Sequence, residues 1–236
     1  MTVWAALLGT SRTVFTAPGF AIFTDLLAGW VCAPGRRTVT GMIAVADPEG
    51  RRAHDAYHRF LRDGAWQMSR LWRILCVSAV GRFAPGGVVE LVCDDTLHHK
   101  TGPKVAGSGV FRDAVRSTVK KIVYARELNL VVVCLRVAPP WGGCPIAVPV
   151  NARLHRKNDD VTTIGHAANM IREIAGWLPG RDLHLCADGT YATLAGRLPD
   201  RTQLTCRMRR DAALYQPPPP RTGRRGRPRT KGDRLP

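Results

Sequence analysis

Two aspartates each follow an apolar run whose composition is typical of a β-strand. Asp94 closes the run 88–94 (VVELVCD), and Asp188 follows the run 183–187 (LHLCA). A carboxylate at a strand end is held rigidly yet lies exposed at the edge of a sheet, where a pair of such groups can share divalent cations. If the two strands are neighbours in one sheet, the pair predicts a metal site with Asp94 and Asp188 as ligands.

Each aspartate taken alone also fits a turn. Asp188 precedes a glycine, a common turn pair, and Asp94 could simply start a loop. Asp94 is followed directly by Asp95, which is the alternative candidate for the same role. It is their equivalent position after two strands that favours a functional pair.

The stretch after the first aspartate, 96–104 (TLHHKTGPK), reads as a loop rich in hydrogen-bond donors. Its Lys100 and Lys104 are candidates for contacting DNA phosphates. His98 and His99 are equally compatible with exposed loop residues. The stretch lacks the spacing of a P-loop, and the chain contains no GxSxG motif and no cysteine–histidine cluster at zinc spacing.

The segment 201–236 is strongly basic, with eleven basic and two acidic residues and therefore a net charge of +9. At 225–229 it reads RGRPR, the arrangement of an AT-hook-like arm, in which arginines enter a narrow A·T minor groove. Segments rich in arginine, glycine and proline also occur as plain linkers. The candidate DNA-binding residues are Arg224, Arg225, Arg227 and Arg229.

The whole chain has 35 basic and 18 acidic residues and a net charge of +17, which indicates a polyanionic partner. Nucleic acid, and for the AT-hook-like arm double-stranded DNA, is favoured over a membrane, because the basic tail lacks an amphipathic apolar face. The longest apolar stretch, 14–32, is interrupted by Pro18, Gly19 and Asp25, which argues against a membrane span. With seven cysteines interpreted as reduced thiols, we expect a soluble cytoplasmic protein.

The first part of the chain has the three- and four-residue apolar periodicity of helices. Asp63-Gly64 predicts a break between two of them. We therefore expect a helical region over 1–87, followed by a core over 88–211 and a basic linker or arm over 212–236.

Beyond Pro85 the helical periodicity gives way to short runs rich in valine and isoleucine, which are typical of β-strands. A helix is expected over 161–178, with Asp159 or Asp160 as its N-cap, and a short helix over 191–198. The expected strands are 88–94, 128–137, 145–154, 183–187 and 203–208. The expected order is three strands, a helix, a strand, a helix and a strand, which is the order of the ribonuclease H-like fold. We therefore expect an α/β protein with a mixed sheet. Other α/β folds share this order.

Several stretches resemble the insertion-sequence transposases described as DDE superfamily endonucleases, over nearly the full length. They include AYHRFLRDGAWQMSRLW, CDDTLHHKTGPKVAGSGVFRDAVRST, LNLVVVCLRVAPPWGG, LHLCADGTYA and RMRRDAALYQPPPPRTGRRGRPRTKGDRLP. The resemblance implies a ribonuclease H-like catalytic core behind a helical DNA-binding region. It also implies hydrolysis and strand transfer at transposon ends, dependent on Mg²⁺ (or Mn²⁺).

Carried over by position, Asp94 in the DDT pattern is the first catalytic carboxylate, with Asp95 as the alternative, and Asp188 is the second. The family uses a third acid, normally a glutamate in a later helix, whereas the last glutamate in this chain is Glu173. We therefore expect an incomplete transposase. The alternative is a non-catalytic DNA-binding remnant that occupies transposon ends, and the sequence is also compatible with a homo-oligomer.

Overall fold

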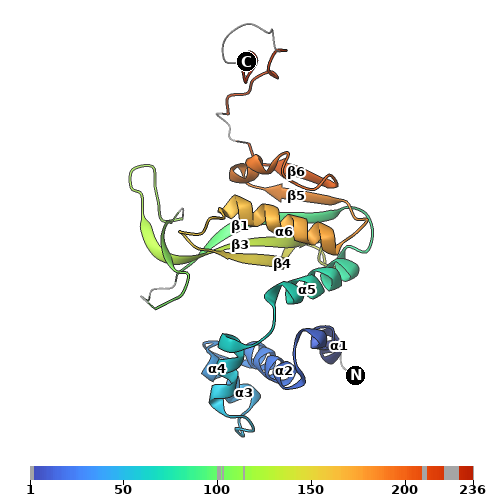
Figure 1. Cartoon of the computed structure of the whole chain (residues 1–236), viewed down its shortest axis with the longest axis vertical. Helices are drawn as coiled ribbons and strands as arrows, with labels where there is room; N and C mark the ends of the chain where they lie inside the picture. The colour runs from blue at the N-terminus through green and yellow to red at the C-terminus, as the bar shows by residue number, and fades with distance from the viewer. Residues whose placement is uncertain are drawn as a thin grey trace.

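The computed structural model describes residues 3–99, 102, 104–113, 115–208, 212–220 and 229–235. A group of helices comes first, and a sheet with further helices follows (Figure 1). The elements are α1 (Val3–Gly9), η1 (Arg12–Val14), α2 (Ala17–Cys32), α3 (Val39–Ala46), α4 (His54–Asp63), α5 (Met68–Phe83), β1 (Val89–His99), β2 (Gly109–Arg112), β3 (Tyr124–Val137), β4 (Ile146–His155), α6 (Thr163–Trp177), β5 (Leu183–Ala187), η2 (Gly189–Leu194) and β6 (Thr202–Cys206).

The strands that the structure describes form one six-stranded mixed sheet. β1 pairs antiparallel with β3, and β3 pairs antiparallel with β4. On its other side β1 pairs parallel with β5, which pairs parallel with β6. This arrangement confirms the predicted ribonuclease H-like α/β fold with a helical N-terminal region.

The first strand is longer than its apolar run predicts. β1 extends to His99, because residues 95–99 pair with residues 131–127 of β3. The expectation that Asp94 ends a strand is therefore wrong, as is the expectation that 96–99 is part of a loop. The extension is polar and mostly exposed, so backbone pairing with the long β3 stabilises it and no apolar face marks it in the sequence. β2, which pairs with the start of β3, was likewise not expected.

The predicted helix break is confirmed, since α4 ends at Asp63 and α5 begins at Met68. The N-cap of α6 differs from the prediction. Thr162, not Asp159 or Asp160, is the cap, and its hydroxyl accepts a hydrogen bond from the backbone N–H of Gly165 at 3.1 Å.

The main core lies between one face of the sheet and the helices α5 and α6 (Figure 1). Alternate residues of the strands face this core, as the two-residue period of a strand requires. They include Leu91 and Cys93 of β1 and Val131, Val133 and Leu135 of β3, all of them buried. α6 contributes its buried side chains Met170, Ile171 and Ile174. The core therefore fixes which β1 side chains face the helices and which face away from them.

A second cluster of buried residues joins α2, α3 and α4. At its centre the hydroxyl of Tyr57 donates to Asp47 at 3.1 Å and to Asp25 at 3.3 Å. Burial opposes ionisation of Asp47, but hydrogen bonds from the backbone N–H of Arg52 and from Arg51 outweigh it and lower the pKa to about 2. α5 instead packs with the sheet, and the division of the chain at residue 87 stays a prediction.

In the described part of the chain no helix is long and apolar enough to cross a membrane. All seven cysteines are free thiols, as the sequence predicts. Burial raises the pKa of Cys76 and of Cys93 to about 12, so neither is ionised near neutral pH. They serve as small core residues.

The contact between α2 and α3 depends on a glycine. A Cβ placed on Gly29 would lie 2.3 Å from the carbonyl oxygen of Met42. We expect Gly29→Ala to destabilise the protein by about 1–3 kcal/mol through overpacking. The control is Gly81→Ala in α5, where a Cβ meets nothing within 4 Å, and which should stabilise by about 0.5–1 kcal/mol. Thermal unfolding followed by circular dichroism measures both, and equal effects would contradict the close helix contact.

Candidate functional site

The parallel pairing of β1 with β5 brings the two predicted acids together. The register places Cys93 opposite Ala187, and the next residues along the two chains are Asp94 and Asp188. Asp188 keeps an extended backbone, with φ −73° and ψ 175°. Because side chains alternate along extended chains, Asp94 and Asp188 lie on the same face, opposite the face packed against α6.

The electrostatics of Asp94 reflect this arrangement. Its pKa is raised, first by partial burial and then by the negative charges of Asp95 and Asp188, while a hydrogen bond from the Asp95 backbone N–H opposes the rise. Within the described residues no ion pair joins Asp94 or Asp188 to a basic side chain. A cation between the carboxylates would relieve the repulsion.

The carboxylate of Asp188 is fixed by its own loop. It accepts hydrogen bonds from the backbone N–H of Thr190 at 2.9 Å and from the Thr190 hydroxyl at 3.2 Å. This capping interaction starts η2 directly after β5. Asp188 is therefore held in place while it remains exposed to solvent.

Asp95 lies on the other face of β1. Its two oxygens accept hydrogen bonds from the hydroxyl of Tyr191 at 3.2 Å and from the side-chain N–H of Asn129 at 3.3 Å. Tyr191 and Asn129 are both buried. The structure thus separates the adjacent candidates Asp94 and Asp95 onto opposite faces of one strand, and only Asp94 shares a face with Asp188.

Most of the predicted DNA-binding residues lie outside the described residues, namely Lys100, Arg224, Arg225 and Arg227. Lys104 is described and exposed. Arg229 is exposed too and lies 3.5 Å from Asp233. Their role in DNA binding stays a prediction.

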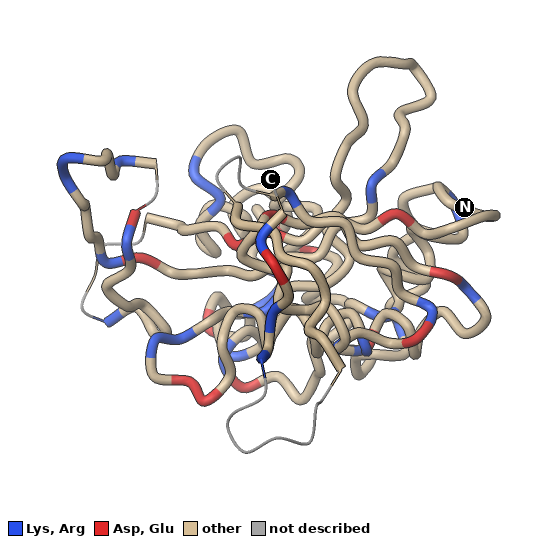
Figure 2. Tube along the Cα trace, turned by 90° about the horizontal axis from the view of Figure 1, so that it is seen from above, with Lys and Arg blue, Asp and Glu red and all other residues tan. Residues whose placement is uncertain are grey.

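A basic pocket of about 370 Å³ lies at one end of the sheet and was not predicted. It brings together Arg126 from β3 and Arg156 and Lys157 from the loop between β4 and α6, and Ser108 lines it as well. Lys and Arg lie along many segments of the chain, so the positive charge is not confined to the tail (Figure 2). The sequence could not have shown this pocket, because its cations come from distant segments.

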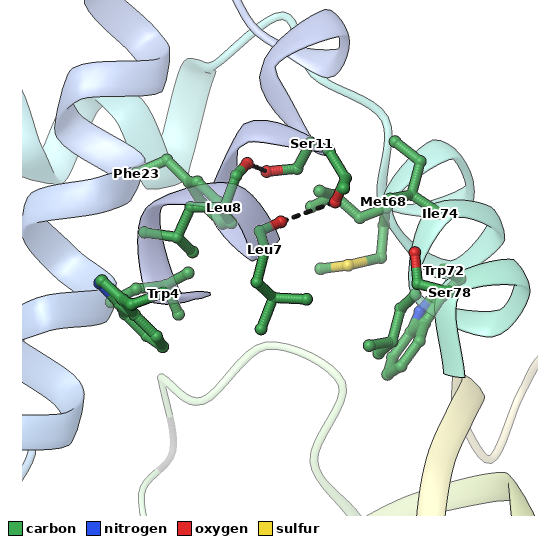
Figure 3. A pocket seen from close by; sticks show the side chains of 13 residues that line it. Trp4, Leu7, Leu8, Ser11, Phe23, Met68, Trp72, Ile74 and Ser78 are labelled. Atoms are coloured by element: carbon green, nitrogen blue, oxygen red, sulfur yellow. Dashed lines mark hydrogen bonds between the residues drawn. The ribbon is translucent and has the colours of Figure 1, made fainter. Parts of the chain in front are cut away.

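A second pocket, of about 380 Å³, lies between the N-terminal helices and α5 (Figure 3). Its lining is almost entirely apolar, with Trp4, Leu7, Phe23, Met68 and Trp72 among its side chains. It contains no titratable group and therefore offers nothing for metal binding or acid–base chemistry.

Two groups of three side chains elsewhere could hold a metal ion. One comprises His99, Asp113 and Glu127, and the other His155, Asp159 and His166. Neither group could be recognised in the sequence, because each combines residues from separate elements.

The ribonuclease H-like sheet, with two acids side by side on neighbouring parallel strands, has the architecture that the resemblance to DDE enzymes implies. A family model described as DDE superfamily endonuclease matches residues 17–236, and the chain belongs to this family. The family comprises transposase-like nucleases that act on DNA and use divalent metals. A comparison with curated protein sequences gave no match.

The repulsion around Asp94 predicts a link between cation binding and stability. Because its pKa is raised in the folded state, ionisation of Asp94 lowers stability as the pH rises above the ordinary aspartate range. Asp94→Asn should therefore melt at or above the temperature of the parent chain in chelator at pH 7. Mn²⁺ at ten times its Kd should stabilise the parent by about 1.4 kcal/mol, or about 3–6 °C, and leave Asp94→Asn unchanged.

Asp95→Asn is the matched control, since it removes an adjacent acid on the opposite face, and it should keep the Mn²⁺ shift. Differential scanning calorimetry measures all three proteins. An unchanged shift in Asp94→Asn would contradict the assignment, and its loss only in Asp95→Asn would transfer the role to Asp95.

Proposed function

We propose that this chain belongs to a DNA transposase that cleaves and joins DNA at insertion-sequence ends, with Asp94 and Asp188 as ligands of Mg²⁺ (or Mn²⁺). The observation that supports this most strongly is the register of β1 and β5, in which Cys93 pairs with Ala187 directly before Asp94 and Asp188.

The donor set fits a hard divalent cation. Mg²⁺ is bound in proteins through one or two carboxylates together with water and substrate phosphates. Elsewhere in the described structure, buried acids have basic partners: Asp47 has Arg51, and Glu127 has His99 and Arg116. Asp94 and Asp188 are exposed and lie beside other carboxylates, and a cation bound between them would relieve that repulsion.

The residues of this chain would divide the work of phosphoryl transfer. Asp94 and Asp188 would hold a cation that, when bound, would lower the pKa of an attacking water or 3′-hydroxyl and stabilise the leaving oxygen. Asp94, on a central strand, and Asp188, fixed by Thr190, supply oxygen ligands at set positions. Arg126, Arg156 and Lys157 supply positive charge for the DNA backbone.

One observation favours the alternative, a DNA-binding remnant without catalysis. The acids after Asp188 are Asp200, Asp211 and Asp233, and no glutamate follows Glu173. Glu173 itself is held by Arg153 at 2.6 and 2.7 Å and by Asn151 at 2.9 Å. These 236 residues therefore supply two of the three acids that the family resemblance implies.

DNA binding should depend steeply on salt and on the basic tail. Deleting residues 217–236 removes seven basic residues and one acidic residue. The slope of log K against log salt should become shallower by about 0.9 for each phosphate that the shortened chain no longer neutralises. Fluorescence anisotropy with a short duplex at several salt concentrations measures this.

An internal control replaces Arg224, Arg225 and Arg227 by glutamine, which keeps the length of the tail. It should reproduce part of the effect of the deletion. An unchanged affinity and slope in both variants would show that the tail does not contact DNA.

The 236-residue chain should bind DNA without cutting it at a useful rate. Two-metal phosphoryl transfer requires cations about 3.5–4 Å apart, serving both the attacking and the leaving oxygen. Two carboxylates hold one cation well and leave the second poorly held. The assay is nicking of a supercoiled plasmid carrying the element's ends, in Mg²⁺ or Mn²⁺, with Asp94→Asn and the exposed acid variant Asp200→Asn as controls.

Strong nicking that is lost in Asp94→Asn and kept in Asp200→Asn would show that the catalytic site of this chain is complete. That result would still support the transposase. Absence of both DNA binding and Asp94-dependent cation binding would overturn the transposase itself.

A further inference from the structure

Three metal-ligating side chains meet where β4 leads into α6. His155 is the last residue of β4, Asp159 lies in the connecting loop, and His166 lies near the start of α6. Each offers one ligand atom, and these atoms all lie within 4.8 Å of one another. The group lies outside the Asp94–Asp188 pair and has a different chemistry, with two imidazoles and one carboxylate.

The two imidazoles have unsatisfied nitrogens. Nδ1 of His155 and Nε2 of His166 are buried and have no hydrogen-bond partner. The rings lie edge to face, with centroids 5.7 Å apart and planes at 69°. A buried polar atom without a partner is costly and calls for an explanation, which a bound ion provides here for both nitrogens.

The carboxylate of the group is held by its own turn. Oδ2 of Asp159 accepts a hydrogen bond from the backbone N–H of Arg156 at 3.1 Å, and the backbone N–H of Asp159 donates to the carbonyl of Arg156 at 3.0 Å. These bonds keep Asp159 beside the end of β4. The third ligand is thereby held next to the two rings at little entropic cost.

The other group, His99, Asp113 and Glu127, is already filled by a cation of the protein. The guanidinium of Arg116 is hydrogen-bonded to Asp113, and it donates to Glu127 at 3.2 Å. His99 is also paired with Glu127, at 2.5 Å. Within the described residues no basic side chain forms an ion pair with Asp159. The group of His155, Asp159 and His166 is therefore not occupied by a cation of the protein itself.

We propose that His155, Asp159 and His166 form a binding site for Zn²⁺, with a water molecule as the fourth ligand. Imidazole and carboxylate ligands suit Zn²⁺, whereas Mg²⁺ prefers oxygen ligands alone. Two ligand atoms that each lie about 2.1 Å from one ion are at most about 4.2 Å apart. The three ligand atoms here lie within 4.8 Å of one another, so a small side-chain adjustment suffices to bring them around one ion.

The site would fasten the loop that carries part of the basic pocket. Arg156 and Lys157 lie between the ligands His155 and Asp159, and both line that pocket with Arg126. An ion ligated by His155, just before these two cations in the chain, and by Asp159, just after them, would restrain the backbone that carries Arg156 and Lys157. Zn²⁺ should therefore stabilise the fold and strengthen DNA binding without taking part in chemistry at Asp94.

The test uses the full 236-residue chain, stripped of metal by a chelator and titrated with Zn²⁺ in a calorimeter. His155→Gln and His166→Gln should each weaken Zn²⁺ binding by more than about tenfold, because even partners outside the coordination sphere change metal affinity by about 10- to 100-fold. His98→Gln removes an exposed histidine outside the group and should bind Zn²⁺ like the parent. Asp94→Asn combined with Asp188→Asn should also retain this binding, which separates the two cation sites.

Co²⁺ provides an independent readout, because its visible spectrum reports the ligand set. Nitrogen and oxygen ligation without a thiolate-to-cobalt band is expected, and the spectrum should be lost in the His155→Gln and His166→Gln variants. A thiolate band would assign the ion to cysteines and overturn the proposal. Zn²⁺ affinity unchanged in both histidine variants, or lost only in the aspartate double variant, would overturn it as well.

Discussion

The parallel pairing of β1 with β5 is the constraint on which the rest of the site depends. β1 is the only strand in the described sheet with an antiparallel neighbour on one side and a parallel one on the other. A parallel neighbour requires a crossover, and α6 supplies part of it by packing over the sheet. The helix is thus the connection that lets β5 return beside β1, and it also fixes which face Asp94 occupies.

The same arrangement has a cost in stability. Buried acids in the described part of the chain have basic partners, as Asp47 has Arg51 and Glu127 has Arg116. Asp94 instead is partly buried and lies among like charges, and burial first and then these charges raise its pKa. In natural proteins, charged groups in unfavourable electrostatic surroundings occur mainly at functional sites. The like-charged neighbours of Asp94 are therefore more informative than its lack of an ion pair, because exposed acids such as Asp200 also form none within the described residues.

The sequence predicted those elements whose patterns arise within the chain itself. The apolar run before Asp94, the run before Asp188 and the periodicity of α6 identified the strands and the crossover, and the strand order then implied that β1 and β5 are neighbours. The extension of β1 to His99 could not be predicted, because pairing with β3 stabilises residues that have no strand pattern of their own. The basic pocket and the histidine group depend in the same way on segments that only the fold brings together.

Under the two proposals, one chain would hold two kinds of cation. A pair of carboxylates with no fixed third ligand favours an ion that keeps its water and exchanges phosphate oxygens, as phosphoryl transfer requires. Two half-buried imidazoles, at the end of β4 and near the start of α6, favour an ion that binds nitrogen firmly. The two sets lie on opposite faces of the sheet, because His155 is paired with Asn129, whose side chain contacts Asp95 on the α6 face. Ligand type and the sheet between them would thus keep the proposed structural ion apart from the proposed reacting one.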